Sequence, residues 1–504
     1  MADVLIVGAG PTGLVLALWL TRQGIGVRII DKSAGPGETS RALAVQARTL
    51  ELYRQVGLAD AVVAAGHRVP AMNVWARGRH RARVVFGDAG ADVSPYPFVL
   101  VYPQDHHERL LVDALQALGV TVERNTELLG FDDTGGAVAA RLRLPGGGEQ
   151  TATFRFLAAC DGARSTVRHA LGTGFEGGTY KHVFYVADVE LGGLDAIDEG
   201  HLALDGGDFI LVLPYDATGK ARLVGTVKDE RADHAESFAF EDVDRDAAAS
   251  LGLRIDTVHW FSTYRVHHRV ADAFRQGRAF LLGDAAHIHS PAGGQGMNTG
   301  ILDAINLSWK LAHVLQGRAP EALLDSYAIE RMAFARTLVD TTDRAFTVVT
   351  SESRLANFVK TYVAPQLASL AYRFRSLGTL LFETVSQTTL DYRDSPVSSG
   401  QAGEVRGGDR LPWVEAAGAD NFAPLPHIGW QLHVYGTAPP DLAAWCSDRG
   451  VALRAFAWNP AHGRAGLARD AAYLVRPDGY VGLAAPSPSP AALDRYFATL
   501  GYRH

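Results

Sequence analysis

Three glycines near the amino end of the chain have the spacing of a phosphate-binding turn. Gly8, Gly10 and Gly13 form a Gly-x-Gly-x-x-Gly motif directly after an apolar run. In such a motif the first glycine permits a tight turn, the second lets the backbone approach a pyrophosphate, and the third lets the next helix pack closely on the sheet. Asp31 ends the following apolar run, and a carboxylate at that place accepts hydrogen bonds from ribose hydroxyls. Lys32, the next residue, is also expected to bind the cofactor. The motif predicts dinucleotide binding; a glycine-rich turn without a ligand is the alternative.

Two later segments indicate which dinucleotide is bound. Residues 160–168 read CDGARSTVR, and residues 278–311 read RAFLLGDAAHIHSPAGGQGMNTGILDAINLSWKL. Together with the glycine motif they resemble the three fingerprints of the class A flavin monooxygenases, which hydroxylate aromatic rings with FAD and NAD(P)H. The resemblance extends over about residues 1–390. It implies a Rossmann-like FAD-binding domain of the p-hydroxybenzoate hydroxylase type.

The resemblance also implies which residues hold the cofactor. Asp284 resembles the family aspartate that hydrogen-bonds the ribityl chain of FAD, and Pro291 resembles the proline near the reactive edge of the flavin. A helix starting at Gly296, Met297 and Asn298 would face the flavin N1–C2=O edge with its N–H groups, which stabilise the negative charge of reduced flavin. The remaining implied contacts are Arg41 and Gln104 for the FAD phosphates and the flavin side, the pair Asp161 and Gly162 for FAD and NAD(P)H, and Arg164 and Arg168 for the pyridine-nucleotide phosphates.

Several of these residues also have a simpler structural interpretation. Asp161 could serve only as the cap of a helix over residues 163–171, and Arg41 could be a surface charge. His287 and His289 have the spacing of a metal-binding pair. No third ligand accompanies them, however, and flavin chemistry needs no metal, so we expect no metal site.

The segment before the third fingerprint narrows the resemblance. Residues 260–271, WFSTYRVHHRVA, resemble phenol hydroxylases and the related phenolic-acid and polyketide hydroxylases. This implies that Tyr264 contacts the substrate beside the flavin; an aromatic residue that merely packs in a sheet is the alternative. Phenol hydroxylases place an aspartate near the position of Leu43 or Ala44, where this sequence has no acid, so the base for a phenol is not identified. His267 and His268 are weaker candidates, because histidines titrate near neutral pH.

The elements that must position these residues follow from the hydrophobic pattern. Residues 3–7 and 27–31 are predicted to be buried strands on either side of a helix over 14–23, which makes a βαβ unit. Strand-like runs between residues 180 and 265, separated by Gly- and Asp-rich turns, predict an antiparallel sheet. The other expected elements are helices over 46–56, 105–118 and about 297–315, strands over 154–159 and 280–284, and long helices to roughly residue 390.

The expected fold class is therefore α/β, with an antiparallel-sheet substrate domain and a C-terminal domain attached. The C-terminal order of strand, helix, strand, hairpin and helix resembles the thioredoxin-like domain of phenol-hydroxylase-type enzymes. It has no CxxC motif, because Cys446 stands alone, and disulfide exchange needs a second thiol. The expected boundaries are 1–175 and 271–392 for the two parts of the FAD-binding domain, 176–270 for the substrate domain, 393–410 for a linker, and 411–504 for the thioredoxin-like domain.

Composition limits the setting in which the protein works. The chain has 504 residues and a formal net charge of −7 without any basic block, which disfavours nucleic acid or an anionic membrane as a partner. Two cysteines provide no disulfide framework, so a reducing, cytoplasmic setting is expected. The apolar stretch Val4–Leu20 lacks a basic n-region and contains several glycines, so we expect neither an export signal nor a transmembrane span. The relatives suggest a homodimer.

These inferences combine into one hypothesis about function. The chain is expected to be a single-component monooxygenase that uses FAD, with NADPH or NADH as a transient co-substrate. It would consume O₂ and hydroxylate a phenolic or polycyclic aromatic substrate through a flavin C4a-hydroperoxide. The alternatives are epoxidation, Baeyer–Villiger-type insertion or antibiotic inactivation on the same fold, and a flavin-binding module without catalysis. The sequence does not distinguish NADH from NADPH, nor does it identify the substrate.

Overall fold

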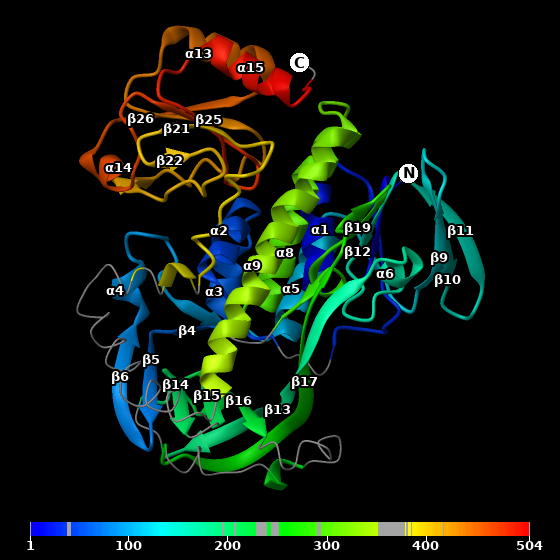
Figure 1. Ribbon diagram of the computed structural model, residues 1–504, viewed down its shortest axis with the longest axis vertical. Coiled ribbons are helices and arrows are strands. Elements are labelled where there is room, and N and C mark those ends of the chain that lie inside the picture. Colours follow the sequence, from blue (N-terminus) through cyan, green and yellow to red (C-terminus); the bar gives the residue numbers. More distant parts are fainter. Residues whose placement is uncertain are drawn as a thin grey trace.

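A parallel sheet, a large antiparallel sheet and a C-terminal domain make up the molecule (Figure 1). This computed structural model describes residues 2–37, 42–193, 196–205, 208–227, 239–242, 251–289, 294–350, 379, 382–384, 386–416 and 418–502. The parallel sheet and its helices lie in the middle of the molecule, with the antiparallel sheet on one side and the C-terminal domain on the other. No helix in these ranges combines the length and the apolar character that a membrane crossing requires.

The six-stranded central sheet has the order β18-β19-β12-β1-β2-β8. Its middle strands are short, fully or largely buried and rich in branched residues, as a sheet covered on both faces requires. Helix α1 packs against both α5 and α8, which places the glycine motif between them. The bounds are β1 Val4–Val7, α1 Pro11–Arg22, β2 Val27–Ile30, α5 Gln104–Ala117, β8 Val122–Glu123, β12 Phe156–Ala159, β18 Arg275–Gln276, β19 Ala279–Leu281 and α8 Gly296–Leu315. The βαβ unit predicted from the sequence is therefore present.

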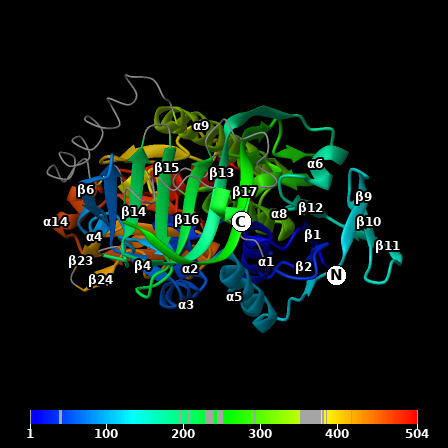
Figure 2. The same ribbon diagram turned by 90° about the horizontal axis from the view of Figure 1, so that it is seen from below.

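The second large sheet has eight strands in the order β20-β17-β13-β16-β15-β14-β5-β6, and Figure 2 shows most of them side by side. Its neighbours are antiparallel except for β14 and β5, which run parallel. The antiparallel strands expected between residues 180 and 265 are present, but the sheet also recruits β5 and β6 from the first part of the chain. The bounds are β5 Ala71–Ala76, β6 Arg79–Val85, β13 Phe175–Gly192, β14 Gly200–Asp205, β15 Asp208–Pro214, β16 Lys220–Val227, β17 Arg254–Ala271 and β20 His287–Ile288.

Smaller elements connect the two sheets. One three-stranded sheet has the order β3-β7-β4, and another has the order β11-β10-β9. Helix α9 starts directly after a short 3₁₀ turn and contacts both β17 and β15 of the large sheet. The bounds are β3 Ala44–Val45, α2 Ala47–Gln55, α3 Ala59–Ala65, β4 His67–Val69, α4 Phe86–Gly90, β7 Val99–Val101, β9 Glu127–Asp133, β10 Val138–Arg143, β11 Glu149–Phe154, α6 Thr166–Ala170, η3 Gly283–Ala285, η5 Glu321–Leu324 and α9 Asp325–Thr350.

The C-terminal domain has its own six-stranded sheet, β22-β21-β28-β27-β25-β26. The segment 393–410, expected to be a linker, contains β21 and β22, and Ser399 and Gly400 pair with Leu483 and Ala484 of β28. Composition could not reveal this pairing, because the partner strand lies far along the chain. The bounds are β21 Ser399–Ala402, β22 Val405–Arg406, β25 Gln431–Tyr435, α13 Pro440–Arg449, β26 Ala452–Phe456, α14 Pro460–Arg464, β27 Ala472–Val475, β28 Val481–Ala485 and α15 Pro490–Thr499, with the small hairpin β23 Glu415–Ala416 and β24 Ala419–Asp420 beside it.

Candidate active site

The turn between β1 and α1 is closed on one side and open on the other. Gly8 has φ +103°, and a Cβ there would overlap the carbonyl oxygen of Cys160. A Cβ on Gly13 would overlap the carbonyl oxygen of Gly8, so only glycine lets α1 start this close to β1. Around Gly10, in contrast, no atom lies within 4 Å of the Cβ position. Gly10 is also the N-cap of α1 without a side-chain cap, so open space adjoins free backbone N–H groups, as anion binding requires.

Asp31 lies directly beside this turn. Its Oδ2 accepts a hydrogen bond of 2.7 Å from the Ala9 backbone N–H, and its Oδ1 accepts one of 2.7 Å from Ser33. Arg124 lies 3.7 Å from the same carboxylate. Lys32 is exposed beside it. The carboxylate of Asp31 therefore joins the glycine turn to the segment after β2. The sequence predicted Asp31 as the partner of a ribose, and that role stays a prediction.

Gln104 is the first residue of α5, and its amide is already engaged within the protein. Its Nε2 donates to Glu108 Oε1 at 2.8 Å, one turn along the helix. Burial raises the pKa of Glu108, while the hydrogen bonds from Gln104 and from the Gly37 backbone lower it. Gln104 thus lies in the first turn of α5 with its amide nitrogen bonded to a buried carboxyl group, and its expected contact with FAD stays a prediction.

The loop after β12 contains a carboxylate with one engaged and one unpartnered oxygen. Asp161 Oδ2 accepts from the Val167 backbone N–H at 3.3 Å, which is the helix-capping role considered from the sequence. Asp161 Oδ1 is buried and has no hydrogen-bond partner. Burial raises the pKa of this carboxyl group, as expected for an oxygen that lacks a donor. A donor from a bound ligand would satisfy it, and the next residue, Gly162, has φ +78° with open space around its Cβ position.

The two arginines of this loop differ in their surroundings. Arg168 is buried, and its Nη1 and Nη2 donate to the carbonyls of Ala285 at 2.9 Å and Ala163 at 2.8 Å. Its guanidinium also lies 3.9 Å above the ring of Phe175. Two of its donors thus join the loop after β12 to the turn η3, and the role expected for Arg168 at pyridine-nucleotide phosphates stays a prediction. Arg164 is exposed and keeps its expected role as a prediction.

The turn η3, which carries Asp284, is joined to the glycine motif by a residue that the sequence reasoning missed. A Cβ on Gly283 would lie 2.8 Å from Thr12 Oγ1, and a Cβ on Gly300 would overlap the same oxygen. Thr12 of α1 thus fits into a notch between η3 and α8. The Asp284 side chain is exposed at the rim of this junction. The signal was visible in the sequence as a small polar residue inside the glycine motif, opposite two further glycines.

The start of α8 is held by a fully buried asparagine. Asn298 Nδ2 donates to the Ala44 carbonyl at 2.8 Å, and its Oδ1 accepts from the Gln46 backbone N–H at 3.0 Å and from Thr49 Oγ1 at 2.8 Å. Its side chain therefore joins α8 to the start of α2. The N–H groups of Gly296, Met297 and Asn298 have no acceptor within the helix, as in the first turn of any helix, so they are candidate donors to a ligand.

Tyr264 lies in an aromatic group on the large sheet. Its ring stacks on that of Phe184 with centroids 5.7 Å apart and an interplanar angle of 28°. Phe209 packs against the same group. These contacts agree with the packing interpretation, and a direct role for Tyr264 at the substrate stays a prediction. Arg41 and Pro291 lie outside the described residues.

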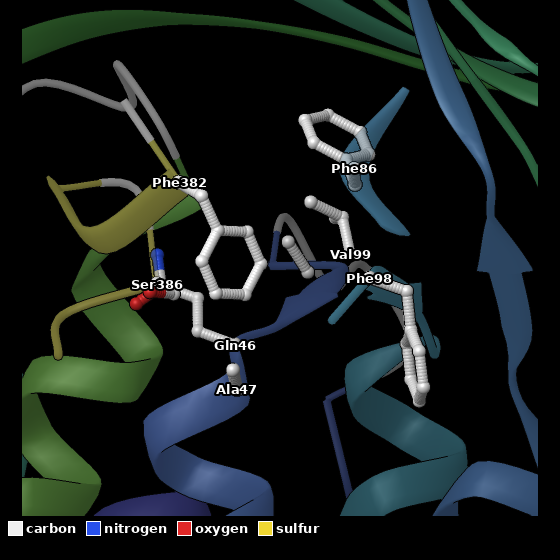
Figure 3. A pocket seen from close by; sticks show the side chains of 8 residues that line it. Gln46, Ala47, Phe86, Phe98, Val99, Phe382 and Ser386 are labelled. Carbon is white, nitrogen blue, oxygen red and sulfur yellow. The ribbon is translucent and has the colours of Figure 1, made fainter. Parts of the chain in front are cut away.

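An apolar pocket lies beside the start of α2 (Figure 3). Gln46 is common to the pocket and to the hydrogen bonds of Asn298, so the pocket adjoins the first turn of α8. The ring of Phe382 forms one side of the pocket in the figure, opposite Phe86, Val99 and Phe98, and packs against the backbone of Gly90, where an added Cβ would lie 2.7 Å from ring carbons. The lining residues are Ala44, Gln46, Ala47, Phe86, Phe98, Val99, Phe382 and Ser386.

Comparison with known proteins agrees with this geometry. A family model described as an FAD binding domain matches residues 1–342. The chain is 40% identical over 405 residues to a 6-methylpretetramide 4-monooxygenase of Streptomyces rimosus, covering 79% of this chain and 71% of the relative. It is 33% identical over 462 residues to the pentachlorophenol 4-monooxygenase of Sphingobium chlorophenolicum, covering 90% and 81%. A solved anhydrotetracycline hydroxylase from Streptomyces rimosus superimposes with a TM-score of 0.78 at 28% identity, covering 99% of this chain and 98% of that one.

Proposed function

The chain belongs to the FAD binding domain family of flavin-dependent monooxygenases, and we propose that it hydroxylates a phenolic or polycyclic aromatic ring bound next to the small apolar pocket beside α2. The observation that carries this proposal is the position of that apolar pocket. Gln46 joins it directly to Asn298 at the start of α8, where the family resemblance places the flavin. The relatives that act on tetracycline precursors and on a chlorophenol support the substrate class.

The residues present fit FAD at its two ends. At the phosphate end, Gly10 leaves open space at the N-terminus of α1. Asp31, which adjoins the glycine turn, would accept from the ribose, and the unpartnered Oδ1 of Asp161 would accept from another donor of the cofactor. At the flavin end, the first turn of α8 offers N–H groups to an anionic edge. FAD, when bound, supplies the redox and oxygen-activating chemistry of the reaction.

The protein's own contribution is to hold the ring and to exclude water. Phe86, Phe98 and Phe382 surround the pocket with carbon, which favours a flat apolar ring over a charged ligand (Figure 3). Gln46 is a polar residue on its wall and is suited to orient a hydroxyl group of the substrate, whereas the Ser386 hydroxyl already bonds to the Glu383 carbonyl and to Thr388. A water-poor site of this kind protects a reactive oxygen donor from hydrolysis and side reactions.

The C-terminal part is proposed to be a thioredoxin-like domain with a structural role. Its inner strand order β26-β25-β27-β28, with β25 and β26 parallel and the following hairpin antiparallel, supports this proposal. Helices α13 and α15 follow β25 and β28, as in the order expected from the sequence. Cys446 is buried, and burial raises the pKa of its thiol to about 11, which disfavours the reactive thiolate.

The test of the proposed function is a substrate panel. The purified protein is mixed with NADPH or NADH in air, together with simple phenols, phenolic acids and multi-ring quinones, and oxidation, oxygenated product and peroxide are measured separately. We expect one ring class to stimulate oxidation and to gain one oxygen atom, as shown by mass spectrometry. An epoxide, a ring-expanded lactone or an oxidised antibiotic as the product would assign one of the alternative reactions instead. Binding of FAD without stimulation by any aromatic compound would contradict the proposal.

A further inference from the structure

Four fully buried charges join the C-terminal domain to the helices of the FAD-binding part. Arg476 follows β27 and donates from Nη1 and Nη2 to Glu330 of α9, at 2.8 and 3.0 Å. The same guanidinium donates from Nε to Asp478 Oδ1 at 3.0 Å. Lys310 of α8 donates to Glu330 Oε2 at 2.8 Å. We call Lys310, Glu330, Arg476 and Asp478 the interdomain cluster; none of their side chains is more than 3% exposed.

The energetics of this cluster point to a role in positioning. Two cations and two anions cancel in formal charge, but each loses its hydration on burial, and apolar residues of the same shape would stabilise the contact about as well. Charged hydrogen bonds differ from apolar contacts in being directional. The cluster therefore fixes the orientation of the hairpin between β27 and β28 on the helices more than it adds to the free energy of unfolding.

The hairpin is fastened directly to the two helices that form the site. Asp478 Oδ2 accepts from the indole Nε1 of Trp309 in α8 at 3.0 Å, and its backbone carbonyl accepts from Arg48 Nη2 in α2 at 2.7 Å. Arg48 lies only two residues after Gln46 of the pocket, and α8 starts at the turn that holds Asn298. One residue of the C-terminal domain thus contacts both α2 and α8.

A second connection reaches the start of α8 through an arginine of α9. Arg331 Nη2 donates to the Thr299 carbonyl at 3.2 Å, and its Nη1 donates to the hydroxyl of Tyr392 at 2.8 Å. Its Nε donates to Asp303, whose other oxygen accepts from the Gly283 N–H at 2.9 Å, beside Asp284.

The same tyrosine continues this connection into the hairpin. The ring of Tyr392 lies 4.4 Å from that of Tyr480, which follows the hairpin turn, and Arg476 lies over both rings. The hairpin therefore also supports the turn η3 and the first turn of α8, through Tyr392 and Arg331.

We propose that the hairpin between β27 and β28 is a positioning element of the FAD site. Through Trp309, Arg48 and Arg331 it holds the first turns of α2 and α8 at the separation that FAD requires, without having to touch the cofactor. FAD affinity should then depend on the C-terminal domain, a function beyond the structural role proposed above.

A matched pair of substitutions tests this proposal. Asp478 accepts from Trp309 Nε1 across the interface and pairs with Arg476 within its own hairpin, whereas Asp494 accepts from Trp445 Nε1 and pairs with Arg449, both inside the C-terminal domain. Asp478→Asn and Asp494→Asn therefore remove the same kind of charge in the two settings. Two quantities are measured: the dissociation constant of FAD from the apoprotein, by fluorescence, and hydrogen exchange of residues 296–303 in the cofactor-free protein.

We expect Asp478→Asn to raise the FAD dissociation constant about tenfold, which corresponds to about 1.4 kcal/mol. It should also speed exchange in residues 296–303, while Asp494→Asn changes neither quantity. Tyr392→Phe, which removes one hydroxyl from Arg331, decides the question if Asp478→Asn does not fold, and it should act in the same direction.

A lower melting temperature with unchanged FAD affinity and unchanged exchange would overturn the proposal. Because hydrogen exchange is measured without cofactor, it shows whether the hairpin holds residues 296–303 in place even if the protein does not bind FAD. Absence of FAD binding by the wild-type protein would contradict the proposed function, but the exchange measurement would still test the positioning role of the hairpin.

Discussion

The three glycines of the turn after β1 differ in what a side chain would meet: Gly8 and Gly13 have no space for a Cβ, whereas Gly10 does. Gly10→Ala introduces a methyl group into open space with an extended backbone that alanine tolerates, so the apoprotein should keep its stability. The methyl group would stand where a pyrophosphate approaches, and we expect the FAD dissociation constant to rise about tenfold. Titration of the apoprotein with FAD measures this. Gly148→Ala, also in open space but far from the site, serves as the control, and an equal effect of both would contradict the assignment.

The ring of Phe382 is a large part of the wall of the pocket. Phe382→Leu enlarges the pocket, so the Michaelis constant of a multi-ring substrate should fall several-fold. With a small phenol, water should enter the enlarged pocket, so more of the NAD(P)H oxidised should yield peroxide instead of hydroxylated product. Gly90→Ala should do the opposite, since its Cβ would lie 2.7 Å from the ring and push it into the pocket. Steady-state kinetics with peroxide detection distinguishes the two. Phe422→Leu in the C-terminal domain is the control, and matching kinetics in all three variants would contradict the role of Phe382.

At the scale of elements, helix α8 has a buried polar stripe that the sequence reasoning did not use. Thr299, Asp303, Asn306, Lys310 and His313 follow one another at intervals of three and four residues, the spacing at which a buried helix face is normally apolar. The pattern was available in the sequence and indicates a face that meets charged partners. The partners themselves, in α9 and in the C-terminal hairpin, could not be predicted, because they come from distant parts of the chain.

The charge of Lys310 in this stripe makes stability depend on pH in a defined direction. Burial lowers the pKa of Lys310 to about 8, outweighing the attraction of Glu330, which Arg476 also neutralises. The unfolded chain keeps the lysine protonated up to about pH 10.5, so between pH 8 and 10.5 it binds more protons than the folded protein. This group therefore makes the folded state more stable as pH rises through that window.

The corresponding variant is Lys310→Met, which keeps the length of the side chain. Relative to this variant, the wild-type protein should gain about 3 kcal/mol in its free energy of unfolding between pH 8 and pH 10.5. Urea unfolding at several pH values in that range measures the difference. A constant difference between the two proteins over the whole range would show that Lys310 is not buried as a charge.

The secondary structure was predictable wherever one local pattern decided it. The βαβ unit, the helix at 296–315 and the C-terminal hairpin were all expected within a few residues of their observed bounds. The recruitment of β5 and β6 into the large sheet was not, because a parallel pairing of β5 with β14 depends on contacts more than a hundred residues apart. In the site, the glycines and Asn298 were predicted from motifs, but Thr12, Phe382 and the connection through Arg331 follow only from packing.

At the scale of the whole molecule, the C-terminal domain is continuous with the rest. Trp430 and Leu432 belong to the same buried cluster as β1 and α8, and the rings of Trp309 and Trp430 lie 5.7 Å apart. Among the buried histidines of the described residues, three in different parts of this body have strongly lowered pKa values: His107 in α5, His313 in α8 and His433 in β25. Burial lowers the pKa of His107 to about 4 and the pKa of each of the other two to about 3.

Together these histidines lower the free energy of unfolding of the whole molecule as the pH falls. Below pH 6.5 the unfolded chain takes up protons at each of them, whereas the folded protein does not until about pH 4 or 3, so stability falls as pH drops through this window. His433→Phe tests the size of the effect, because the imidazole makes only long hydrogen bonds of 3.4 Å and packs among aromatic rings.

Between pH 6.5 and pH 4.5 the wild-type protein should lose about 3 kcal/mol more than this variant in its free energy of unfolding, as measured by urea titration. Since His433 lies in the C-terminal sheet, loss of FAD at pH 4.5 should be reduced in the variant as well. Equal acid sensitivity of FAD binding in the two proteins would mean that the site does not depend on the C-terminal domain.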